Sequence, residues 1–282
     1  MKLVECPRDA MQGFSRLIPT SEKVEYLNLL LEVGFDTLDF GSFVSPKAIP
    51  QMADTAEVYE KLNWKNSKTK LLSIVGNERG AETACGFEGI QVLGFPFSVS
   101  PEFQMRNTHA SQEEALERIG GIWKLAHESG KDLVVYLSMG FGNPYGDDFS
   151  VEVIQQWAKR ISEIGPVIFA VSDTIGVSNR QNIKEVMEGL NDLKSKHEMG
   201  VHLHSNPFSW LEKMEAAFAA GCERFDSALL GFGGCPMAKD ELTGNMATEN
   251  VIAFLSEKNA LPPINEDAYR QAMLMANRLF LG

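Results

Sequence analysis

The chain has 282 residues and a formal net charge of −12, and 44% of its residues are hydrophobic. This composition is typical of a globular protein and excludes disordered, collagenous and coiled-coil proteins. The acidic excess argues against a nucleic-acid partner or an anionic-membrane surface, although a local basic or metal cluster can still bind a small anion. No apolar run approaches the ~20 residues that span a bilayer, so no membrane partner is expected.

The beginning of the chain and its cysteines indicate a compartment. Residues Met1 to Glu5 lack the long apolar segment of a signal peptide and predict a strand instead. The four cysteines, Cys6, Cys85, Cys222 and Cys235, form neither CxxC pairs nor a dense disulfide framework. We therefore expect a cytoplasmic protein with free thiols.

Short apolar runs alternate with amphipathic stretches along the chain. Eight runs are predicted strands: Lys2–Cys6, Thr37–Gly41, Lys70–Val75, Gly89–Leu93, Leu133–Ser138, Val167–Val171, Gly200–His204 and Arg224–Ala228. Helical spacing predicts helices at Glu22–Val33, Gln51–Leu62, Gln112–Glu128, Val151–Ile164, Arg180–His197 and Trp210–Ala220. The helical signal is weak in one connection, around residues 77–84, and the other connections show helical spacing.

Strands that alternate with helices imply parallel βαβ units, and this number of repeats fits an α/β fold of the (β/α)8 TIM-barrel type better than an open sheet. An open doubly wound sheet would place a glycine-rich phosphate loop after the first strand, where this chain has Pro7-Arg8-Asp9. Two additional C-terminal helices are predicted at Thr248–Lys258 and Asn265–Leu279. We expect one catalytic domain over residues 1–282, with a helical extension from about residue 245 that flanks the barrel or joins a subunit contact.

Polar residues gather at the predicted carboxyl ends of the strands, where barrel enzymes place their active sites. Arg8 and Asp9 follow the first strand, and His202 and His204 end the seventh. The other members of this group are Asp39, Ser42, Ser172, Asp173, the glycine-rich stretch from Gly231 to Pro236, and Gly244-Asn245.

His202 and His204 give the sharpest signal. Positions i and i+2 of a strand share one face, so both imidazoles are expected to point into the barrel. Two core histidines satisfied by their neighbours are the alternative. Asp9 favours a metal site, because it adds the anionic oxygen that Mg²⁺ or Mn²⁺ prefers.

Three other candidates each have a structural alternative. The Arg8-Asp9 pair could be an ion pair at the rim of the barrel. Cys235 lies in a Gly-Gly-Cys-Pro loop, where a thiol could exchange a proton or be inert. Asp173 could serve the site or merely cap a helix or form a turn.

The chain resembles the 3-hydroxy-3-methylglutaryl-CoA lyase family, metal-dependent lyases built on TIM barrels with an Arg-Asp-x-x-Gln signature. The matching stretches occur in collinear order over nearly the whole chain. They are Arg8 to Gln12, Ser42 to Lys47 with Pro50-Gln51-Met52, Ser172 to Val177, Val201-His202-x-His204, Gly233 to Pro236, and Gly244 to Glu249.

The resemblance implies a site and a reaction. A Mg²⁺ or Mn²⁺ ion would be held by Asp9, His202, His204 and Asn245, with Glu249 supporting these ligands. Arg8 would stabilise an enolate oxygen, Cys235 would transfer a proton, and Asp39 and Asp173 would complete the catalytic group. Gln12 and Ser42 are expected to contact the substrate. From their place after the fourth predicted strand, Arg106 and Asn107 could contact the phosphates of coenzyme A, or Arg106 could be a solvated basic residue at the rim. The implied substrate is an acyl-CoA, the implied products are acetyl-CoA and acetoacetate, and a homodimer is expected.

The residue types fit this chemistry, because a metal lowers the pKa of a bound hydroxyl and a fixed cation stabilises a thioester enolate. Four departures from the family pattern affect the surroundings of the substrate. They are Asp39 in place of a glutamate, Ser205-Asn206-Pro207-Phe208 in place of Asp-Thr-Tyr-Gly, Asn143 in place of a cysteine, and Ala10 in place of a glycine. Two alternatives stay open: an aldolase or Claisen-type synthase acting on a 2-oxo acid, and a catalytically silent barrel used as a scaffold.

Overall fold

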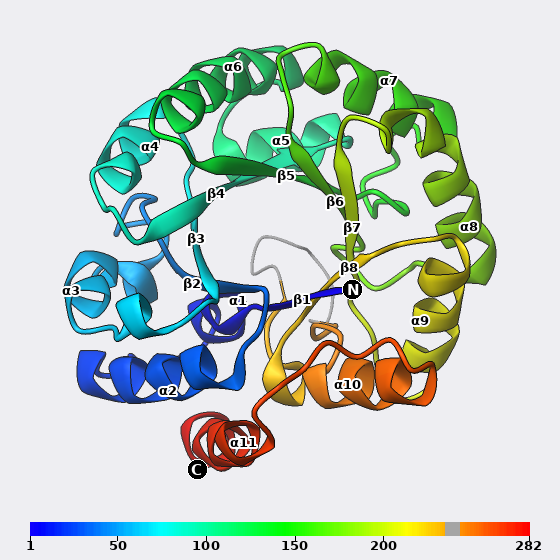
Figure 1. The fold of residues 1–282 in the computed structure, drawn as a ribbon. Coiled ribbons are helices and arrows are strands. Elements are labelled where there is room, and N and C mark those ends of the chain that lie inside the picture. The colour runs from blue at the N-terminus through cyan, green and yellow to red at the C-terminus, as the bar shows by residue number, and fades with distance from the viewer. Residues whose placement is uncertain (235–242) are drawn as a thin grey trace.

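The computed structural model describes residues 1–234 and 243–282 and shows a closed barrel of parallel strands in chain order, β1 to β8 (Figure 1). Hydrogen bonding between β1 and β8 closes the barrel. The strands are β1 Lys2–Glu5, β2 Thr37–Ser42, β3 Lys70–Ile74, β4 Ile90–Ser98, β5 Asp132–Ser138, β6 Ile168–Ser172, β7 Glu198–His202 and β8 Arg224–Ser227. The predicted (β/α)8 barrel is confirmed.

Helices surround this barrel (Figure 1). They are α1 Pro7–Gln12, α2 Thr20–Val33, α3 Thr55–Glu60, α4 Glu78–Cys85, α5 Pro101–Thr108, α6 Gln112–Glu128, α7 Val151–Ser162, α8 Arg180–Gly189, α9 Trp210–Ala219, α10 Thr248–Glu257 and α11 Glu266–Leu281. Short 3-10 turns lie at Pro50–Met52, Trp64–Asn66, Asn191–Leu193 and Leu229–Gly231.

Two short helices beside the site were not predicted. Arg8 and Asp9 lie in α1, not at the end of a strand, because Pro7 starts a helix directly after β1. Helix α5 begins after Ser100, whose side chain accepts a hydrogen bond from the Phe103 backbone amide. Two predicted helices were too long. Helix α8 ends at Gly189 rather than at His197, and α3 covers Thr55–Glu60 rather than Gln51–Leu62.

The barrel interior places polar side chains in layers. The ladder between β7 and β8 pairs Gly200 with Arg224 and, one layer nearer the carboxyl ends of the strands, His202 with Asp226. Gly200 leaves room for its neighbour, because a Cβ there would lie 2.8 Å from Cδ of Arg224. The apolar part of the interior is a small cluster separate from the main core: Leu72, Ile74, Val92, Val134, Tyr136 and Ala170.

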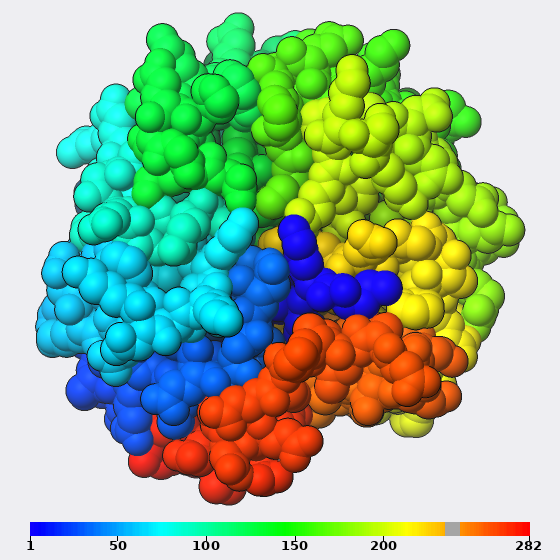
Figure 2. Space-filling view, in the orientation of Figure 1, coloured from blue at the N-terminus to red at the C-terminus, as the bar shows by residue number. Residues whose placement is uncertain are grey.

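The helical extension covers one side of the barrel. Helix α11 packs against α2, and the backbone amide of Asn265 donates a 2.8 Å hydrogen bond to the carbonyl of Val33. Figure 2 shows the face at which the chain begins, with the orange and red segments of α10 and α11 along one edge. Within the described ranges, no helix is long and apolar enough to cross a membrane.

Candidate metal centre and active site

Asp9, His202 and His204 converge at the carboxyl ends of the strands. One carboxylate oxygen of Asp9 and one ring nitrogen of each histidine all lie within 4.8 Å of one another. All three side chains are buried, and the two imidazole rings are 5.4 Å apart between centroids. His202 ends β7, whereas His204 lies just beyond it in an isolated bridge with Asn245. The predicted convergence of these residues is therefore present.

Hydrogen bonds hold Asp9 in its charged form. Its Oδ1 accepts from Arg8 Nη1 at 3.0 Å and from Gln12 Nε2 at 2.7 Å, and its Oδ2 accepts from Asn245 Nδ2 at 2.7 Å. Burial opposes ionisation, but the charges of Arg8, His202 and His204 and the Asn245 hydrogen bond outweigh it and lower the pKa of Asp9 to about 2. The Asp9 carboxylate is therefore ionised at neutral pH and could serve as an anionic ligand.

His204 is poised as a neutral ligand. Burial and the neighbouring His202 lower its pKa to about 4, so its imidazole is uncharged at neutral pH. Its Nδ1 is buried without a hydrogen-bond partner among the described residues. Lys213 fixes the backbone here, because its ammonium donates to the His204 carbonyl at 2.7 Å and to Asp173 Oδ2 at 2.7 Å.

Asn245 is the fourth predicted ligand, and it lies against Asp9. Its Nδ2 also donates to the carbonyl of Phe232 at 2.8 Å, which leaves its amide oxygen for another partner. Gly233 allows this approach, because a Cβ there would lie 2.2 Å from Asn245 Nδ2 and 2.9 Å from Asp9 Oδ2. One carboxylate, two imidazoles and an amide oxygen suit a divalent cation of the Mg²⁺ or Mn²⁺ type, so the residues present fit such an ion.

Arg8 provides a fixed cation beside these ligands. Its Nε lies 3.0 Å and its Nη2 2.6 Å from Asp39 Oδ2, and Nη1 donates to Gln12 Oε1 at 2.9 Å. Burial raises the pKa of Asp39 to about 6, although Arg8 opposes this, and the carboxylates of Asp39 and Asp9 raise the pKa of Arg8 further. The aspartate at position 39 thus reaches Arg8 through both oxygens despite its shorter side chain.

Asp9, His202 and His204, which we call the metal residues, line a cavity of about 600 Å³ together with Arg8. Arg8, Asp9, Gln12, His202 and His204 are among its lining residues. The lining also includes an apolar group and a group on or beside α5 and α6. The apolar group is Val44, Ala48, Ile49, Ile74, Pro96 and Phe103, and the second group is Arg106, Asn107, Thr108, His109 and Arg118. The rest of the lining is Ser45, Gly76, Asn77, Tyr136, Ser138, Ser172 and Thr174.

Arg106 and Asn107 are therefore in the same cavity as the metal residues, as a substrate contact requires. The Arg106 guanidinium lies 4.7 Å from the Tyr145 ring centroid and bonds Glu102 at 2.7 Å. Ser42 is not among the cavity-lining residues, and its Oγ donates to the Ile74 carbonyl at 3.2 Å. The role of Ser42 as a substrate contact stays a prediction.

The remaining predicted residues lie outside the cavity lining or outside the described ranges. Asp173 is buried on Lys213 and Ser178, and its Oδ1 has no hydrogen-bond partner among the described residues. Glu249 accepts from the Leu230 backbone amide at 3.1 Å, and no contact with the metal residues is recorded for it within the described ranges. Cys235 lies outside the described residues.

Sequence reasoning missed two buried side chains beside His202. Tyr136 of β5 packs edge-on against His202 with 5.7 Å between ring centroids and lines the cavity. Asp226 of β8 has Oδ2 3.4 Å from His202 Nδ1. Burial lowers the pKa of His202, but the Asp226 hydrogen bond and charge outweigh it and raise that pKa above its ordinary value. The strand register between β7 and β8, which the sequence alone does not fix, was needed to find Asp226.

Comparison with known proteins places the chain in a family. A family model described as HMGL-like matches residues 3–275. The chain is 30% identical over 257 residues to a 3-hydroxy-3-isohexenylglutaryl-CoA/hydroxy-methylglutaryl-CoA lyase of Pseudomonas aeruginosa, covering 91% of this chain and 85% of that protein. It is 30% identical over 259 residues to the mitochondrial hydroxymethylglutaryl-CoA lyase of Mus musculus, covering 91% of this chain and 78% of that protein.

Solved structures agree with this assignment. The HMG-CoA lyase of Brucella melitensis superposes with a TM-score of 0.91 at 25% identity, covering 100% of this chain and 99% of that one. The HMG-CoA lyase of Acinetobacter baumannii in complex with coenzyme A and 3-methylmalate superposes with a TM-score of 0.90 at 26% identity, covering 99% and 90%. The chain belongs to the HMGL-like family, as its motifs predict.

Proposed function

We propose that the protein is a metal-dependent carbon–carbon lyase that cleaves 3-hydroxy-3-methylglutaryl-CoA, or a related 3-hydroxyacyl-CoA, to acetyl-CoA and a keto acid. The observation that carries this proposal is the convergence of Asp9, His202 and His204 beside buried Arg8 in one cavity. The named activities of the relatives support the same reaction class. Residues 1–282 act as a single catalytic unit in this proposal.

Asp9, His202, His204 and Asn245 would hold the ion, which we propose to be Mg²⁺ or Mn²⁺. When bound, the ion supplies a Lewis acid that lowers the pKa of the substrate 3-hydroxyl. Asp9 contributes a negative charge to this ligand set. His204 contributes a neutral ring whose Nδ1 has no competing hydrogen-bond partner among the described residues.

Arg8 acts on the other fragment of the substrate. Cleavage between C2 and C3 leaves a thioester enolate, whose oxygen gains negative charge as the bond breaks. Asp39 and Gln12 fix the guanidinium before substrate binds, so little reorganisation is needed when that charge develops. The enolate carbon then needs a proton, for which we propose the thiol of Cys235.

Part of the cavity lining suits an anionic group. Arg106, Arg118 and His109 line the cavity together with the polar side chains of Asn107 and Thr108. We propose that Arg106 and Asn107 contact the phosphates of coenzyme A, with attraction that weakens as salt rises. The homodimer and the cytoplasmic location remain predictions. Light scattering would measure the molar mass in solution and so test the homodimer.

The cavity has an apolar side that could contact the acyl group of the substrate. Val44, Ala48, Ile49 and Ile74 form an apolar wall of the cavity. One relative is named for both a methyl and an isohexenyl substituent. We propose that substituents larger than methyl at C3 are also accepted against this wall.

A panel of 3-hydroxyacyl-CoA thioesters tests these proposals. We expect chelated protein to be inactive and to release acetyl-CoA once Mg²⁺ or Mn²⁺ is restored, with Asp9→Asn as the inactive control. Turnover that survives chelation would contradict the metal proposal. Condensation of a 2-oxo acid would instead indicate the aldolase or synthase alternative, and a lack of any turnover would indicate a silent barrel.

A further inference from the structure

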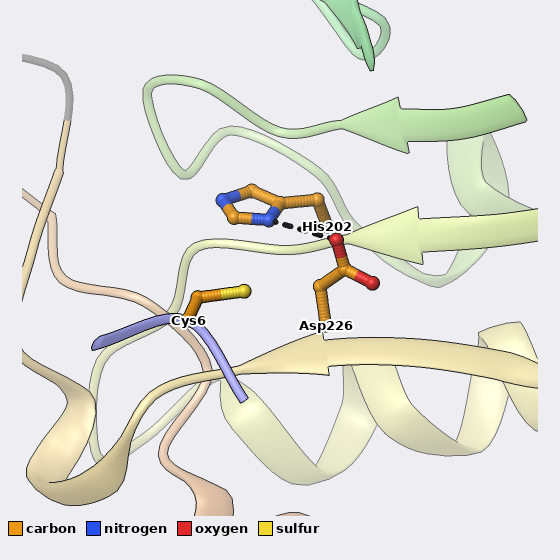
Figure 3. Close-up of side chains that lie close together, drawn as sticks. All are labelled: Cys6, His202 and Asp226. Atoms are coloured by element: carbon orange, nitrogen blue, oxygen red, sulfur yellow. Dashed lines mark hydrogen bonds and ion pairs between the residues drawn. The ribbon is translucent and has the colours of Figure 1, made fainter. Parts of the chain in front are cut away.

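Asp226 is the immediate neighbour of His202 inside the barrel. Figure 3 shows the His202 ring with Nδ1 turned toward Asp226 and its second nitrogen facing away from Asp226. The Nδ1 to Oδ2 distance is 3.4 Å, and the Asp226 side chain is completely buried. Because the two residues are paired across β7 and β8, the sheet itself holds this contact.

A buried cation forms an ion pair with Asp226, although the two atoms concerned, Arg224 Nε and Asp226 Oδ1, have no hydrogen-bond partner among the described residues. Arg224 Nε lies 3.4 Å from Asp226 Oδ1, and Arg224 Nη1 lies 3.7 Å from Glu198 Oε1. Lys2 Nζ in turn lies 2.5 Å from Glu198 Oε2, with 43% of the Lys2 side chain exposed. Alternating charges therefore run through the barrel from the face at which the chain begins, dark blue in Figure 2, to His202.

We propose that Asp226, held by Arg224, is a positioning residue that keeps the His202 proton on Nδ1 and so leaves the Nε2 lone pair for a metal ion. A carboxylate has no proton to give at this contact, so the shared hydrogen belongs to the imidazole. A histidine that ligates a metal through one nitrogen commonly donates the other N–H to a carboxylate, which fixes ring orientation and tautomer. The inference rests on the proposed metal site and is independent of the acyl group.

A different role for the same atoms is a second metal site. Cys6 Sγ, a His202 nitrogen and an Asp226 oxygen also lie within 4.8 Å of one another, and Figure 3 shows the thiol near both partners. Arg224 argues against an ion there, because a divalent cation would be buried beside a guanidinium that already neutralises Asp226. Asp226 therefore serves His202 as a hydrogen-bond acceptor.

The decisive measurement is the tautomer of His202 in the metal-free protein, read from two-bond ¹H–¹⁵N couplings. The chain has five histidines, so single His→Gln variants assign the signals. We expect His202 to carry its proton on Nδ1 in the wild type. In Asp226→Asn the amide can donate to Nδ1, and the proton should move to Nε2, where it competes with metal binding.

Metal affinity gives the second readout. Asp226→Asn should weaken Mn²⁺ binding about 10- to 100-fold by calorimetry. Glu5→Gln is the matched control, since it replaces another fully buried carboxylate that bonds Thr248 and the Leu229 amide rather than a histidine. Arg224→Met should weaken Mn²⁺ binding in the same direction, and Arg224→Lys should restore part of it.

The outcomes separate this inference from the proposed function. A wild-type His202 with its proton on Nε2 would overturn the role of Asp226, and so would Mn²⁺ affinity in Asp226→Asn within twofold of the wild type. Loss of Mn²⁺ binding equal to that of Cys6→Ser would indicate the second metal site instead. If the wild type binds no Mn²⁺, the proposed metal site fails, yet the tautomer still decides whether Asp226 orients His202. If Asp226→Asn does not fold, the wild-type tautomer and the Arg224 variants decide.

Discussion

Arg8 and Asp39 form a buried ion pair in which Asp39 Oδ2 accepts from Nε at 3.0 Å and from Nη2 at 2.6 Å. The pair joins helix α1 to strand β2 and aims the guanidinium at the same cavity as the metal residues. Its geometry depends on the length of the Asp39 side chain, because Oδ1 also accepts from Nε at 3.2 Å.

Lengthening this carboxylate should therefore misplace Arg8. We expect Asp39→Glu to lower kcat/KM roughly 10²-fold, because a shift of about 1 Å at a catalytic group can cost that much. Asp39→Ala should also destabilise the fold by about 3–5 kcal/mol, since it leaves a buried guanidinium short of a partner. Steady-state kinetics and denaturant unfolding measure the two effects. A rise in kcat/KM for Asp39→Glu would show that the shorter side chain is a defect.

The metal ligands can be removed without removing the core. His202→Ala should reduce activity by orders of magnitude and weaken Mn²⁺ binding, because only Asp9 and His204 of this cluster of three then remain. The far-ultraviolet circular dichroism should stay unchanged, since His202 lies at the carboxyl end of its strand. Replacement of His197 by Gln is the control, because His197 is also buried but its Nδ1 accepts from the Val167 backbone amide at 3.3 Å, away from the cluster. Mn²⁺ binding of wild-type strength in His202→Ala would remove His202 from the ligand set.

Stability should depend on Glu5 in a definite direction. Burial raises the pKa of Glu5 to about 8, against a hydrogen bond from Thr248, so the folded state keeps a proton that the unfolded chain loses near pH 4.5. The free energy of unfolding should then fall as pH rises from about 4.5 to about 8, because over this range the folded state binds up to one proton more than the unfolded chain. Urea unfolding should show this decline in the wild type and not in Glu5→Gln. Parallel pH profiles would contradict the raised pKa.

The thiol chemistry can be assigned by alkylation. Cys6 and Cys222 are buried, and Cys85 is only partly exposed with Sγ 3.7 Å from the Leu125 carbonyl. We expect a bulky thiol reagent to inactivate the wild type through Cys235, and a substrate analogue to protect it. Cys235→Ala should lose this sensitivity, while Cys85→Ala should keep it. Inactivation that persists in Cys235→Ala would point to Cys6.

Substrate affinity should depend on the basic end of the cavity. Arg106→Gln should raise KM for acyl-CoA substrates several-fold with little change in kcat, because it removes attraction to an anionic group away from the reacting atoms. The effect should shrink at high salt. Arg180→Gln, which breaks an exposed ion pair with Glu215 on α8 and α9, is the control. Equal KM values for both variants would indicate that Arg106 is a solvated surface residue that does not contact the substrate.

The barrel could be predicted from the sequence because its signals are local. Alternating apolar runs and helical spacing located the strands, and α6 was predicted with the bounds that the structure shows. The proximity of Asp9, His202 and His204 could also be predicted, because Asp9 lies directly after β1, His202 and His204 lie at the end of β7, and strand ends of one kind meet in a barrel.

The charged interior could not be predicted in the same way. Arg224 and Asp226 sit in a run that indicates an ordinary strand, and nothing in their spacing says that they point inward. Their contacts depend on the strand register, which places Arg224 opposite Gly200 and Asp226 opposite His202. Register depends on contacts between residues far apart in the chain, which local patterns do not encode.

The hydrogen bond from Asn245 to Asp9 joins residues 236 positions apart, at opposite ends of the barrel sequence. The same two ends meet where β1 pairs with β8. During synthesis, therefore, the first ligand is made almost at once and must wait for the last. A chain that is still being synthesised can form most of its strands before Asn245 is present, and it then still lacks the site. If the proposed site binds its ion, ion binding would report closure of the barrel and would serve as a probe for the final step of folding.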